Sequence, residues 1–402
     1  MLSFDEAWSK LLALAPALAA ERVALDDACG RVLAEELRSP LDLPGFDYSA
    51  MDGYAVRASD LAGEGPWRLP LRGESKTGSV APALVAGTSC RIFTGGEVPD
   101  GADAVVMQEQ VEAGDGVAAF RARPAVWAHI RRRGEDLAKG SVALARGKRL
   151  GPSQLALAAT VDLAWLTVAR RPVVTVLGTG DELRAPGTAA TPGSIPESNG
   201  VALAAMARGA GAIARVAPFV RDDPGATERA IEQALDGTDV LVTVGGVSVG
   251  AHDHVRPALE KVGVVLDFWR VAIKPGKPLA VGRRGGAIVL GLPGNPGSAM
   301  VTFALFGLPL LRAMQGDLEP MPARQPARLA GAIKREPGRT EFLRALASWE
   351  DRVLKVTPLA NQASGAVTSM AQANALLVVA AEKGSLAPGD EVEILWLHEL
   401  GA

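Results

Sequence analysis

DVLVTVGGVSVGAHD, residues 239–253, lies at the centre of the stretch 172–300 that decides the fold. Its β-branched run Val240–Val244 predicts a strand that is buried on both faces, as in a parallel sheet. The run ends at Gly245-Gly246, where the lack of a Cβ lets the backbone approach a ligand closely. This pattern favours a strand that carries a ligand-binding loop at its end.

The same plan recurs along this stretch, as strand, then a loop with glycine or acidic residues, then helix. The predicted strands are Val173–Leu177, Ile213–Phe219, Val240–Val244 and Ala287–Leu290, and the segments Val255–Lys261 and Ala299–Leu311 supply apolar helices. Such repetition is typical of a βαβ sheet, which binds ligands beyond the carboxyl ends of its strands. We therefore expect Glu182, Asp222, Asp253 and the loop at Asn295 to share one rim.

The composition sets the class of protein. A chain of 402 residues predicts two to four domains, and a net charge of −3 with 22% charged residues gives no field for nucleic acid or a membrane. The two cysteines form no CxxC pair and are predicted to be core thiols of a reduced, cytoplasmic protein. Acidic residues near the N-terminus argue against a signal peptide, and Ser3-x-x-Glu6 predicts a capped first helix through about Leu14.

Prolines and glycines near residues 40–45 and 320–326 punctuate the chain and predict its division into domains. The predicted domains are an α/β domain from residues 1–20 and 171–320, a discontinuous linking domain from 21–45 and 140–170, a β-rich domain over 46–139, and a small C-terminal β-domain over 321–402. The fold class is therefore multidomain α/β plus β.

Several charged or glycine-rich motifs carry both a functional and an ordinary interpretation. Arg131–Asp136, RRRGED, suits an oxyanion beside a metal-binding aspartate, but is also typical of a solvated charged turn. Lys274–Pro278, KPGKP, presents two ammonium groups between the strand-like runs 268–273 and 279–282, which suits an anion or a plain basic hairpin. Gly294–Ser298, GNPGS, points free amides at an anion or simply caps a helix.

Acidic residues in turn-forming loops are candidate Mg²⁺ ligands, since hard oxygen ligands suit this ion when substrate phosphates complete the shell. They are Asp52, Asp136, Glu182, Asp222 and Asp253. No Walker A sequence or GxGxxG occurs, so neither a P-loop nor a dinucleotide fold is supported. His252 and His254 have no third ligand in evidence and are not taken as a metal pair.

Taken together, the motifs resemble one family in order along nearly the whole chain. They are SAMDGYAVR (49–57), FTGGEVPDGADAVVMQE (93–109), IRRRGED (130–136), LGTGDEL (177–183), RDDP (221–224), GGVSVG (245–250), IKPGKP (273–278), GLPGNPGSA (291–299) and PGRTEFLR (337–344). The family is the molybdopterin molybdenumtransferases, which include bacterial MoeA, the E domain of gephyrin and its plant counterpart.

The resemblance implies an elongated four-domain homodimer with a third domain of the MogA/MoaB type. Its cleft would lie between that domain of one subunit and the second domain of the other. The implied reaction takes adenylylated molybdopterin and molybdate and uses Mg²⁺ to release AMP, leaving molybdenum on the dithiolene sulfurs. The adenylyltransferase and downstream cofactor-handling proteins would be partners, with no nucleic acid or membrane.

By motif position, the resemblance also implies roles for single residues. The catalytic acids would be Asp52, Asp136, Glu182, Asp222 and Asp253, of which all but Asp136 would hold the metal. The substrate-binding residues would be Thr94, Lys274, Lys277, Asn295, Ser298, Arg344 and Ser369. Tyr48, Glu197 and Ala251 depart from the residues usual in the family. An adenylyltransferase and a binding scaffold without turnover are the alternative functions.

Overall fold

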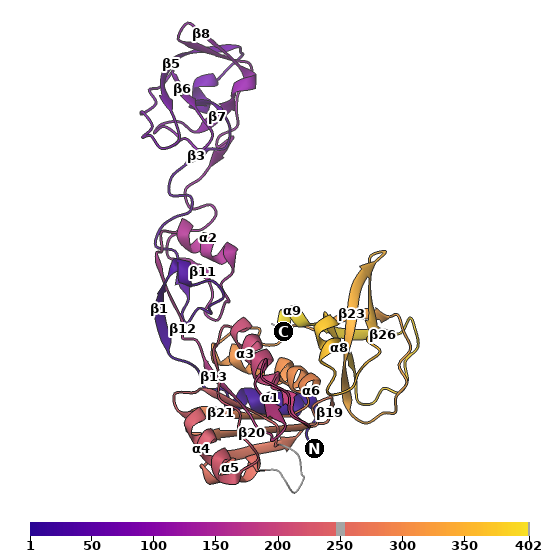
Figure 1. The fold of residues 1–402 in the computed structure, drawn as a ribbon. Helices are drawn as coiled ribbons and strands as arrows, with labels where there is room; N and C mark the ends of the chain where they lie inside the picture. Colours follow the sequence, from indigo (N-terminus) through magenta and orange to yellow (C-terminus); the bar gives the residue numbers. More distant parts are fainter. Residues whose placement is uncertain (247–253, 401–402) are drawn as a thin grey trace.

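The computed structural model describes residues 1–246 and 254–400 of an elongated molecule. An α/β body carries a long β-rich arm on one side and a separate β-sheet unit on the other (Figure 1). This arrangement confirms the predicted multidomain α/β-plus-β fold class, while the exact domain boundaries stay a prediction. Ala251, His252 and Asp253 lie outside the described residues, so the predicted role of Asp253 stays a prediction.

The body is built on a six-stranded sheet with the order β16-β13-β17-β21-β20-β18. Its strands are β13 (Val173–Gly178), β16 (Ile213–Val216), β17 (Val240–Val244), β18 (Val265–Arg270), β20 (Pro278–Arg284) and β21 (Ala287–Leu292). The four strands predicted from the sequence are parallel, because β13 pairs in parallel with β16 and with β17, and β17 pairs in parallel with β21. The predicted strand 213–219 is shorter, since Ala217–Phe219 leave the sheet before Pro224 opens the next helix.

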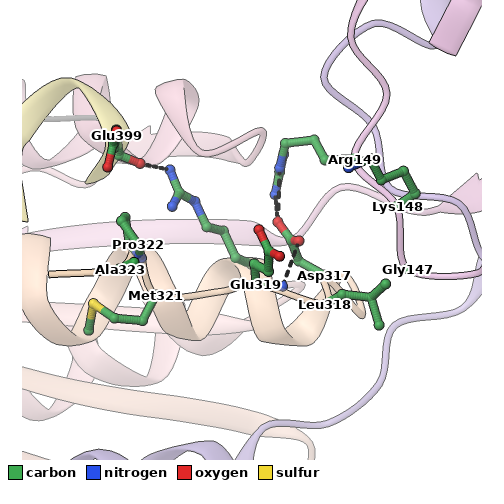
Figure 2. Close-up of a pocket in the computed structure, with 11 residues that line it drawn as sticks. Gly147, Lys148, Arg149, Asp317, Leu318, Glu319, Met321, Pro322, Ala323 and Glu399 are labelled. Carbon is green, nitrogen blue, oxygen red and sulfur yellow. Dashed lines mark hydrogen bonds and ion pairs between the residues drawn. The ribbon is translucent and has the colours of Figure 1, made fainter. Parts of the chain in front are cut away.

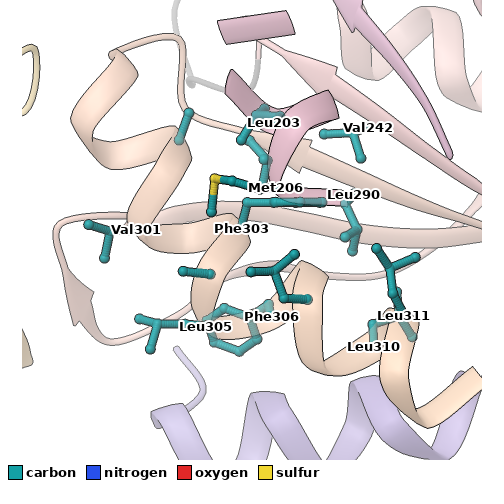
Figure 3. Close-up of a cluster of buried hydrophobic side chains, with 14 of the residues drawn as sticks. Leu203, Met206, Val242, Leu290, Val301, Phe303, Leu305, Phe306, Leu310 and Leu311 are labelled. Atoms are coloured by element: carbon teal, nitrogen blue, oxygen red, sulfur yellow. The ribbon is translucent and has the colours of Figure 1, made fainter. Parts of the chain in front are cut away.

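Helices cover both faces of this sheet. They are α1 (Phe4–Leu14), α3 (Asn199–Gly209), α4 (Pro224–Leu235), α5 (Val255–Lys261), α6 (Pro296–Thr302) and α7 (Leu308–Met314), with a π-helical stretch over Phe303–Gly307. The predicted capping box of α1 is present, because the Ser3 Oγ accepts from the Glu6 N–H and Glu6 accepts from Ser3 N–H. Figure 3 shows the apolar faces meeting in the core, where Phe303 and Phe306 are fully buried.

The helical run Pro296–Met314 has the length and hydropathy of a membrane span, with 19 residues and a mean hydropathy of 1.4. In the structure 83% of its apolar window is buried inside the body, against the sheet and α1. Its apolar composition therefore serves the core, where side chains from both faces of the helix find partners.

The arm leaves the body and returns to it through paired strands. Its inner part contains β1 (Ala20–Ala24), β2 (Leu37–Arg38), β11 (Val142–Leu144), β12 (Trp165–Ala169), α2 (Pro152–Thr160) and a 3₁₀ turn over Leu25–Asp27. β1 pairs antiparallel with β12, and β2 pairs antiparallel with β11. Two distant parts of the chain thus form one connecting unit, with its own core around Leu33, Leu150 and Leu166.

The outer part of the arm is a six-stranded sheet with the order β7-β4-β6-β5-β9-β8. Its elements are β3 (Tyr48–Ser49), β4 (Gly53–Val56), β5 (Trp67–Ser75), β6 (Ser89–Ile92), β7 (Ala104–Met107), β8 (Val111–Gly114), β9 (Val117–Phe120) and β10 (Ile130–Arg131), with 3₁₀ turns over Ala58–Leu61 and Gln108–Gln110. Tyr54 and Phe120 pack edge to face in its core, with ring centroids 6.3 Å apart.

A second six-stranded sheet lies on the other side of the body. It contains β19 (Ile273–Lys274), β22 (Gln325–Leu329), β23 (Thr340–Glu350), β24 (Val353–Pro358), β25 (Ala375–Val379) and β26 (Glu391–Trp396), with α8 (Val367–Gln372) and α9 (Leu397–Leu400). The prediction of one strand-like run over 268–273 is therefore wrong at its C-terminal end, because β18 ends at Arg270. Ile273 leaves the body sheet and pairs with Thr340, because β19 joins the edge of β23.

A pocket of about 700 Å³ lies where the arm, the body and the C-terminal unit meet (Figure 2). Arg149 from the arm is paired with Asp317 at the end of the body, with 2.9 Å between the guanidinium Nη2 and the carboxylate Oδ2. Arg312 donates to the carbonyl oxygen of Glu399 in α9 at 2.5 Å. None of the residues predicted for the site lines this pocket. Its contacts hold the three parts together.

The prediction that both cysteines are core thiols is half wrong. Cys90 in β6 is buried, whereas Cys29 is exposed. Cys29 follows the 3₁₀ turn 25–27 and precedes Gly30, which has a φ of +74°, so this tight turn places the thiol in solvent. Burial raises the pKa of the Cys90 thiol to about 11.

We expect the two thiols to differ strongly in their rate of alkylation. The thiolate is the reactive form, and Cys90 is both inaccessible and held protonated. Brief treatment of the native protein with iodoacetamide at about pH 8, followed by peptide mass mapping, should modify Cys29 and leave Cys90 free. In denaturant both should react at similar rates. Equal modification of the native protein would contradict the burial of Cys90.

Candidate functional site

The loops after the parallel strands of the body form one rim, as the sequence predicts. A pocket of about 180 Å³ opens there between the ends of β13, β17 and β21. Its lining residues are Gly178, Thr179, Gly180, Glu182, Leu183, Ile195, Pro196, Glu197, Ser198, Asn199, Asp222, Val244, Gly245, Gly246, Gly294 and Pro296. Glu182 and Asp222 thus share one pocket, and Gly294 and Pro296 bring the Asn295 loop to it.

Glycine is required at the end of β17 because the chain turns there against its neighbours. Gly245 has a φ of +93°, and a Cβ on it would lie 2.8 Å from the Thr179 carbonyl oxygen. Gly246 has a φ of +60°, and its Cβ would lie 2.3 Å from a methyl group of Val255. These two glycines let the backbone turn where it lines the pocket, and the predicted close approach to a ligand stays a prediction.

Glu197 and Asn199 also line the pocket, although the sequence analysis treated Glu197 only as a departure and passed over Asn199. Ser198 makes no side-chain cap of α3; the Glu197 Oε1 accepts from the Gly200 N–H at 2.7 Å instead. Asn199 Nδ2 donates to the Gly294 carbonyl oxygen at 2.9 Å and ties α3 to the neighbouring loop. The Ser-Asn pair before an apolar run was the available signal of this helix start.

The carboxylates at the mouth of this pocket are exposed and backed by neighbouring loops. Asp181 accepts the Asp222 backbone N–H at 3.2 Å, and Arg221 donates to the Asp181 carbonyl oxygen at 3.1 Å. The two loops that carry Glu182 and Asp222 are therefore bonded to each other. This contact fixes both acids on the same side of the rim.

Asp52 lies in the outer part of the arm, where Thr94 binds it twice. The Thr94 backbone N–H and its Oγ each donate to Asp52 Oδ1 at 2.8 Å. The N–H and hydroxyl bonds lower the pKa of Asp52 below its usual value. This pair keeps the carboxylate charged and oriented, so Thr94 acts here through Asp52.

Replacing Thr94 with valine should raise the pKa of Asp52, because the hydroxyl bond that favours the charged form is lost. If Asp52 must be charged for turnover, the acid limb of the kcat/KM profile should move to higher pH. The matched control is Thr88→Val, since the Thr88 hydroxyl donates to the Val85 carbonyl oxygen and not to a carboxylate within the described residues. If the acid limb of the Thr94 variant is unchanged, the reaction does not depend on the ionisation of Asp52.

Asp136 lines another pocket of the arm, of about 710 Å³, with Leu43, Pro44, Tyr48, Arg131 and Glu135. Tyr48, which departs from the residue usual in the family, lines the same pocket. The neighbouring arginines are engaged in ion pairs: Arg133 with Asp42 at 2.7 Å and Arg131 with Glu135 at 3.4 Å. Figure 1 shows this part of the arm far from the rim of the body in the same chain.

The two lysines of the KPGKP turn are both exposed but point to different surroundings. Lys274 in β19 pairs with Glu341, with 3.3 Å between Nζ and Oε1. Lys277 lines a separate pocket beside Trp269 and Arg270. The expectation that one strand end presents both ammonium groups is therefore wrong, because β19 carries Lys274 to the C-terminal sheet.

The remaining predicted substrate residues lie where α6 meets the C-terminal unit. Asn295 is exposed at the start of α6, whereas Ser298 and Ser369 are buried, and the Ser369 hydroxyl donates to the Ala366 carbonyl oxygen. Arg344 is fully buried, and burial lowers the pKa of its guanidinium. It donates to the carbonyl oxygens of Asn361 and Ala363, so its hydrogen bonds hold a loop.

Across residues 1–246 and 254–400, no group of three or more His, Cys, Asp or Glu side chains is arranged to hold a metal ion. The structure brings Glu182 and Asp222 together at the rim and places Asp52 on the arm. The expected set of metal-holding carboxylates is thus divided between two parts of the chain.

Comparison with known proteins assigns all three parts of the chain to described families. Residues 2–161 match "MoeA N-terminal region (domain I and II)", residues 175–313 match "Probable molybdopterin binding domain", and residues 326–397 match "MoeA C-terminal region (domain IV)". The chain is 37% identical to the molybdopterin molybdenumtransferase of Haemophilus influenzae over 98% of both proteins. It is 35% identical to that of Bacillus subtilis, over 94% of this chain and 90% of the relative. The crystal structure of the molybdopterin biosynthesis MoeA protein from Pyrococcus horikoshii superposes with a TM-score of 0.84 at 32% identity, over 99% of both chains.

Proposed function

The chain belongs to the MoeA family of molybdopterin molybdenumtransferases, and from this premise we propose how its site works. It is an enzyme of molybdenum cofactor biosynthesis. The alternatives of a single-domain adenylyltransferase and of a scaffold without turnover are set aside, because relatives named for this activity match along nearly the whole chain.

We propose that the substrates are adenylylated molybdopterin and molybdate, with AMP as the released product. The observation that carries this proposal is the rim pocket, where Glu182 and Asp222 share a mouth with glycine loops and two helix starts. Backbone N–H groups at helix starts favour phosphate, while carboxylates favour a cation that neutralises it. Such a pocket suits the cleavage of a phosphoanhydride.

The residues present at this rim fit Mg²⁺. This ion is usually held by one or two carboxylates and completes its shell with water and substrate phosphates. Glu182 and Asp222 are two such carboxylates within one pocket. When bound, Mg²⁺ supplies charge neutralisation to the pyrophosphate. Glu182 and Asp222 would hold it, and the glycine loop at Gly245 would let the phosphates approach the backbone.

The cleavage and the transfer are proposed as two balanced changes. A water oxygen adds to phosphorus as the bridging P–O bond breaks, and AMP leaves with the bridging oxygen. The two dithiolene sulfurs bond to molybdenum as one molybdate oxygen leaves as water, which takes the two thiol protons. Lys274 and Lys277 are exposed cations that would attract the molybdate dianion. Ser298 and Ser369 are buried, so their proposed contacts would require a local opening.

We propose that the active protein is a homodimer whose cleft takes the arm of one subunit and the rim of the other. In support, Asp52, Thr94 and Asp136 lie on the arm, remote from Glu182 and Asp222 in the same chain. A closed two-fold dimer would form two equivalent clefts. We place the enzyme in the cytoplasm, where it would receive its substrate from the adenylyltransferase and deliver its product to cofactor-handling proteins.

The experiment that tests the proposed function is AMP release from adenylylated molybdopterin by the purified full chain. Molybdate and Mg²⁺ are each added or omitted, and molybdenum bound to the pterin is measured in parallel. We expect AMP release to be coupled to molybdenum loading only when both ions are present. Binding of the substrate without AMP release under any of these conditions would overturn the proposed reaction. Sedimentation equilibrium of the same sample tests the dimer.

A further inference from the structure

The C-terminal sheet sets the position of Lys274. Strand β19 carries this lysine out of the body sheet and into parallel pairing with β23, where Lys274 lies directly opposite Glu341. A backbone hydrogen bond fastens the same short strand, because the Thr340 N–H donates to the Ala272 carbonyl oxygen at 3.1 Å. A side chain expected to serve the substrate is therefore held by residues of another unit of the molecule.

The Glu341 carboxylate is nearly buried and faces two cations through one oxygen. Its side chain is 10% exposed, and Oε1 lies 3.3 Å from the Lys274 Nζ and 3.4 Å from the Arg335 Nε. The two cations differ in their surroundings, because the Arg335 side chain is 4% exposed and that of Lys274 is 55% exposed. The carboxylate thus lies between an internal guanidinium and an ammonium at the surface.

Arg335 keeps the carboxylate in place. Its Nη1 donates to the carbonyl oxygens of Ala380 and Lys383, each at 2.7 Å, and its Nη2 donates to the Arg339 carbonyl oxygen at 2.7 Å. These acceptors are neutral, so Glu341 supplies the negative charge that a buried guanidinium requires. Because three hydrogen bonds fix the guanidinium, the carboxylate that pairs with it is a fixed point for Lys274.

The Lys274 ammonium keeps donors for a ligand while it is held. An ammonium group carries three N–H donors, and the hydrogen bond to Glu341 uses one of them. A lysine side chain that moves freely loses conformational entropy when it binds an anion. The contact with Glu341 restricts the side chain in advance and leaves more than half of it exposed. The arrangement suits recognition of a small oxyanion by a preorganised cation.

We propose that Glu341 is a positioning residue for molybdate: it holds the Lys274 ammonium where the dianion binds and does not touch the substrate itself. This role rests on the proposed function, in which Lys274 attracts molybdate. Lys274, Arg335 and Glu341 together carry one net positive charge, and loss of the carboxylate would leave two. A carboxylate that acted through its charge alone would therefore weaken molybdate binding. A carboxylate that positions Lys274 strengthens it, so the two roles predict changes of opposite sign.

The test is molybdate binding to the full chain by equilibrium dialysis, with molybdenum measured by mass spectrometry. Glu341→Gln should weaken binding about 10-fold, the smaller of the losses seen when a group that orients the ligands of an ion is removed. Glu341→Asp keeps the charge and should fall between the parent chain and Glu341→Gln. In the AMP-release assay, Glu341→Gln should raise the KM for molybdate about 10-fold and leave kcat within about twofold, because saturating molybdate orients the ammonium itself.

A double variant separates positioning from a general effect on the fold. Glu341→Gln leaves Arg335 without its carboxylate, so the melting temperature should fall, and binding is measured well below it. In the background of Lys274→Met, Glu341→Gln should cause no further loss of molybdate binding, because the ammonium that it positions is absent. The matched control is Glu350→Gln in the same strand, which removes the carboxylate that accepts from the Lys355 Nζ at 2.8 Å. This control should bind molybdate as the parent chain does.

The outcomes separate the role of Glu341 from the proposed function. Unchanged or tighter molybdate binding by Glu341→Gln would overturn the positioning role, even if AMP release and molybdenum loading remain intact. An equal loss with and without Lys274 would also overturn it, and so would absence of molybdate binding by the parent chain. A parent chain that binds molybdate through Lys274 and Glu341 but never releases AMP would sustain the positioning role and remove the proposed reaction.

Discussion

Replacing Glu182 with glutamine is expected to lower the rate of AMP release about 100-fold, which is the typical loss when one preorganised charge is removed from a reacting centre. Glutamine keeps the size of the side chain and removes the negative charge that we assign to holding the cation. Glu182 is exposed at the rim, so the substitution should leave the melting temperature unchanged. The measurement is single-turnover AMP release at saturating substrate, with Mg²⁺ varied from below to above its requirement.

The dependence of the rate on Mg²⁺ concentration tests whether Glu182 acts by holding the cation. Raising Mg²⁺ should restore part of the lost rate in Glu182→Gln, since the weakened site fills again at higher concentration. The control is Glu260→Gln, which changes an exposed acid of α5 that pairs with Arg256 outside the rim pocket. Full activity in the Glu182 variant would remove this residue from the proposed machinery and leave Asp222 to be tested alone.

Replacing Arg344 with methionine is expected to destabilise the protein by about 3 kcal/mol or more, since each buried acceptor that loses its donor costs about 1–3 kcal/mol. The Arg344 guanidinium is fully buried and donates to the Asn361 and Ala363 carbonyl oxygens and to Gln362 Oε1. The loop that it holds continues to Ser364, whose carbonyl oxygen accepts the Ser298 N–H at 3.1 Å. The measurement is the free energy of unfolding of the parent chain and of the variant, obtained from denaturant titration.

The same variant also tests the role that the sequence assigned to Arg344, contact with the substrate. Arg328→Met is the matched control, because Arg328 is an exposed arginine of the same sheet whose guanidinium donates to the Gly389 carbonyl oxygen. Loss of stability with Arg344→Met alone supports a structural role. A variant as stable as the parent but unable to bind molybdate would show that the guanidinium acts on the substrate.

The body of the molecule could be predicted because its signals are local. β-branched runs that end in glycine mark β13, β17 and β21, and Ser3 with Glu6 marks the start of α1. The buried parallel strands need apolar residues on both faces, so their pattern stands out from the rest of the chain. The shared rim of Glu182 and Asp222 then follows from strand direction alone.

The features that sequence reasoning missed depend on contacts between distant segments. Arg344 belongs to the apolar run of β23, and only the loop 361–364 explains why a guanidinium can be buried there. Ile273 joins β23 because the C-terminal sheet offers it an open edge, which no local pattern announces. Glu197 accepts the Gly200 N–H at the start of α3, and only the folded structure shows this contact.

The point where the arm leaves the body has a consequence for how this protein can be divided. Arg170 N–H donates to the Ala19 carbonyl oxygen at 2.8 Å, and Ala20 pairs with Ala169 directly beside them. The chain therefore departs and returns at one place, so the whole arm is an insertion into an otherwise continuous body. A short turn could join residues 19 and 170 without disturbing the sheet. Because two antiparallel connections carry the arm, any rotation of the arm about its own length would have to twist both of them together.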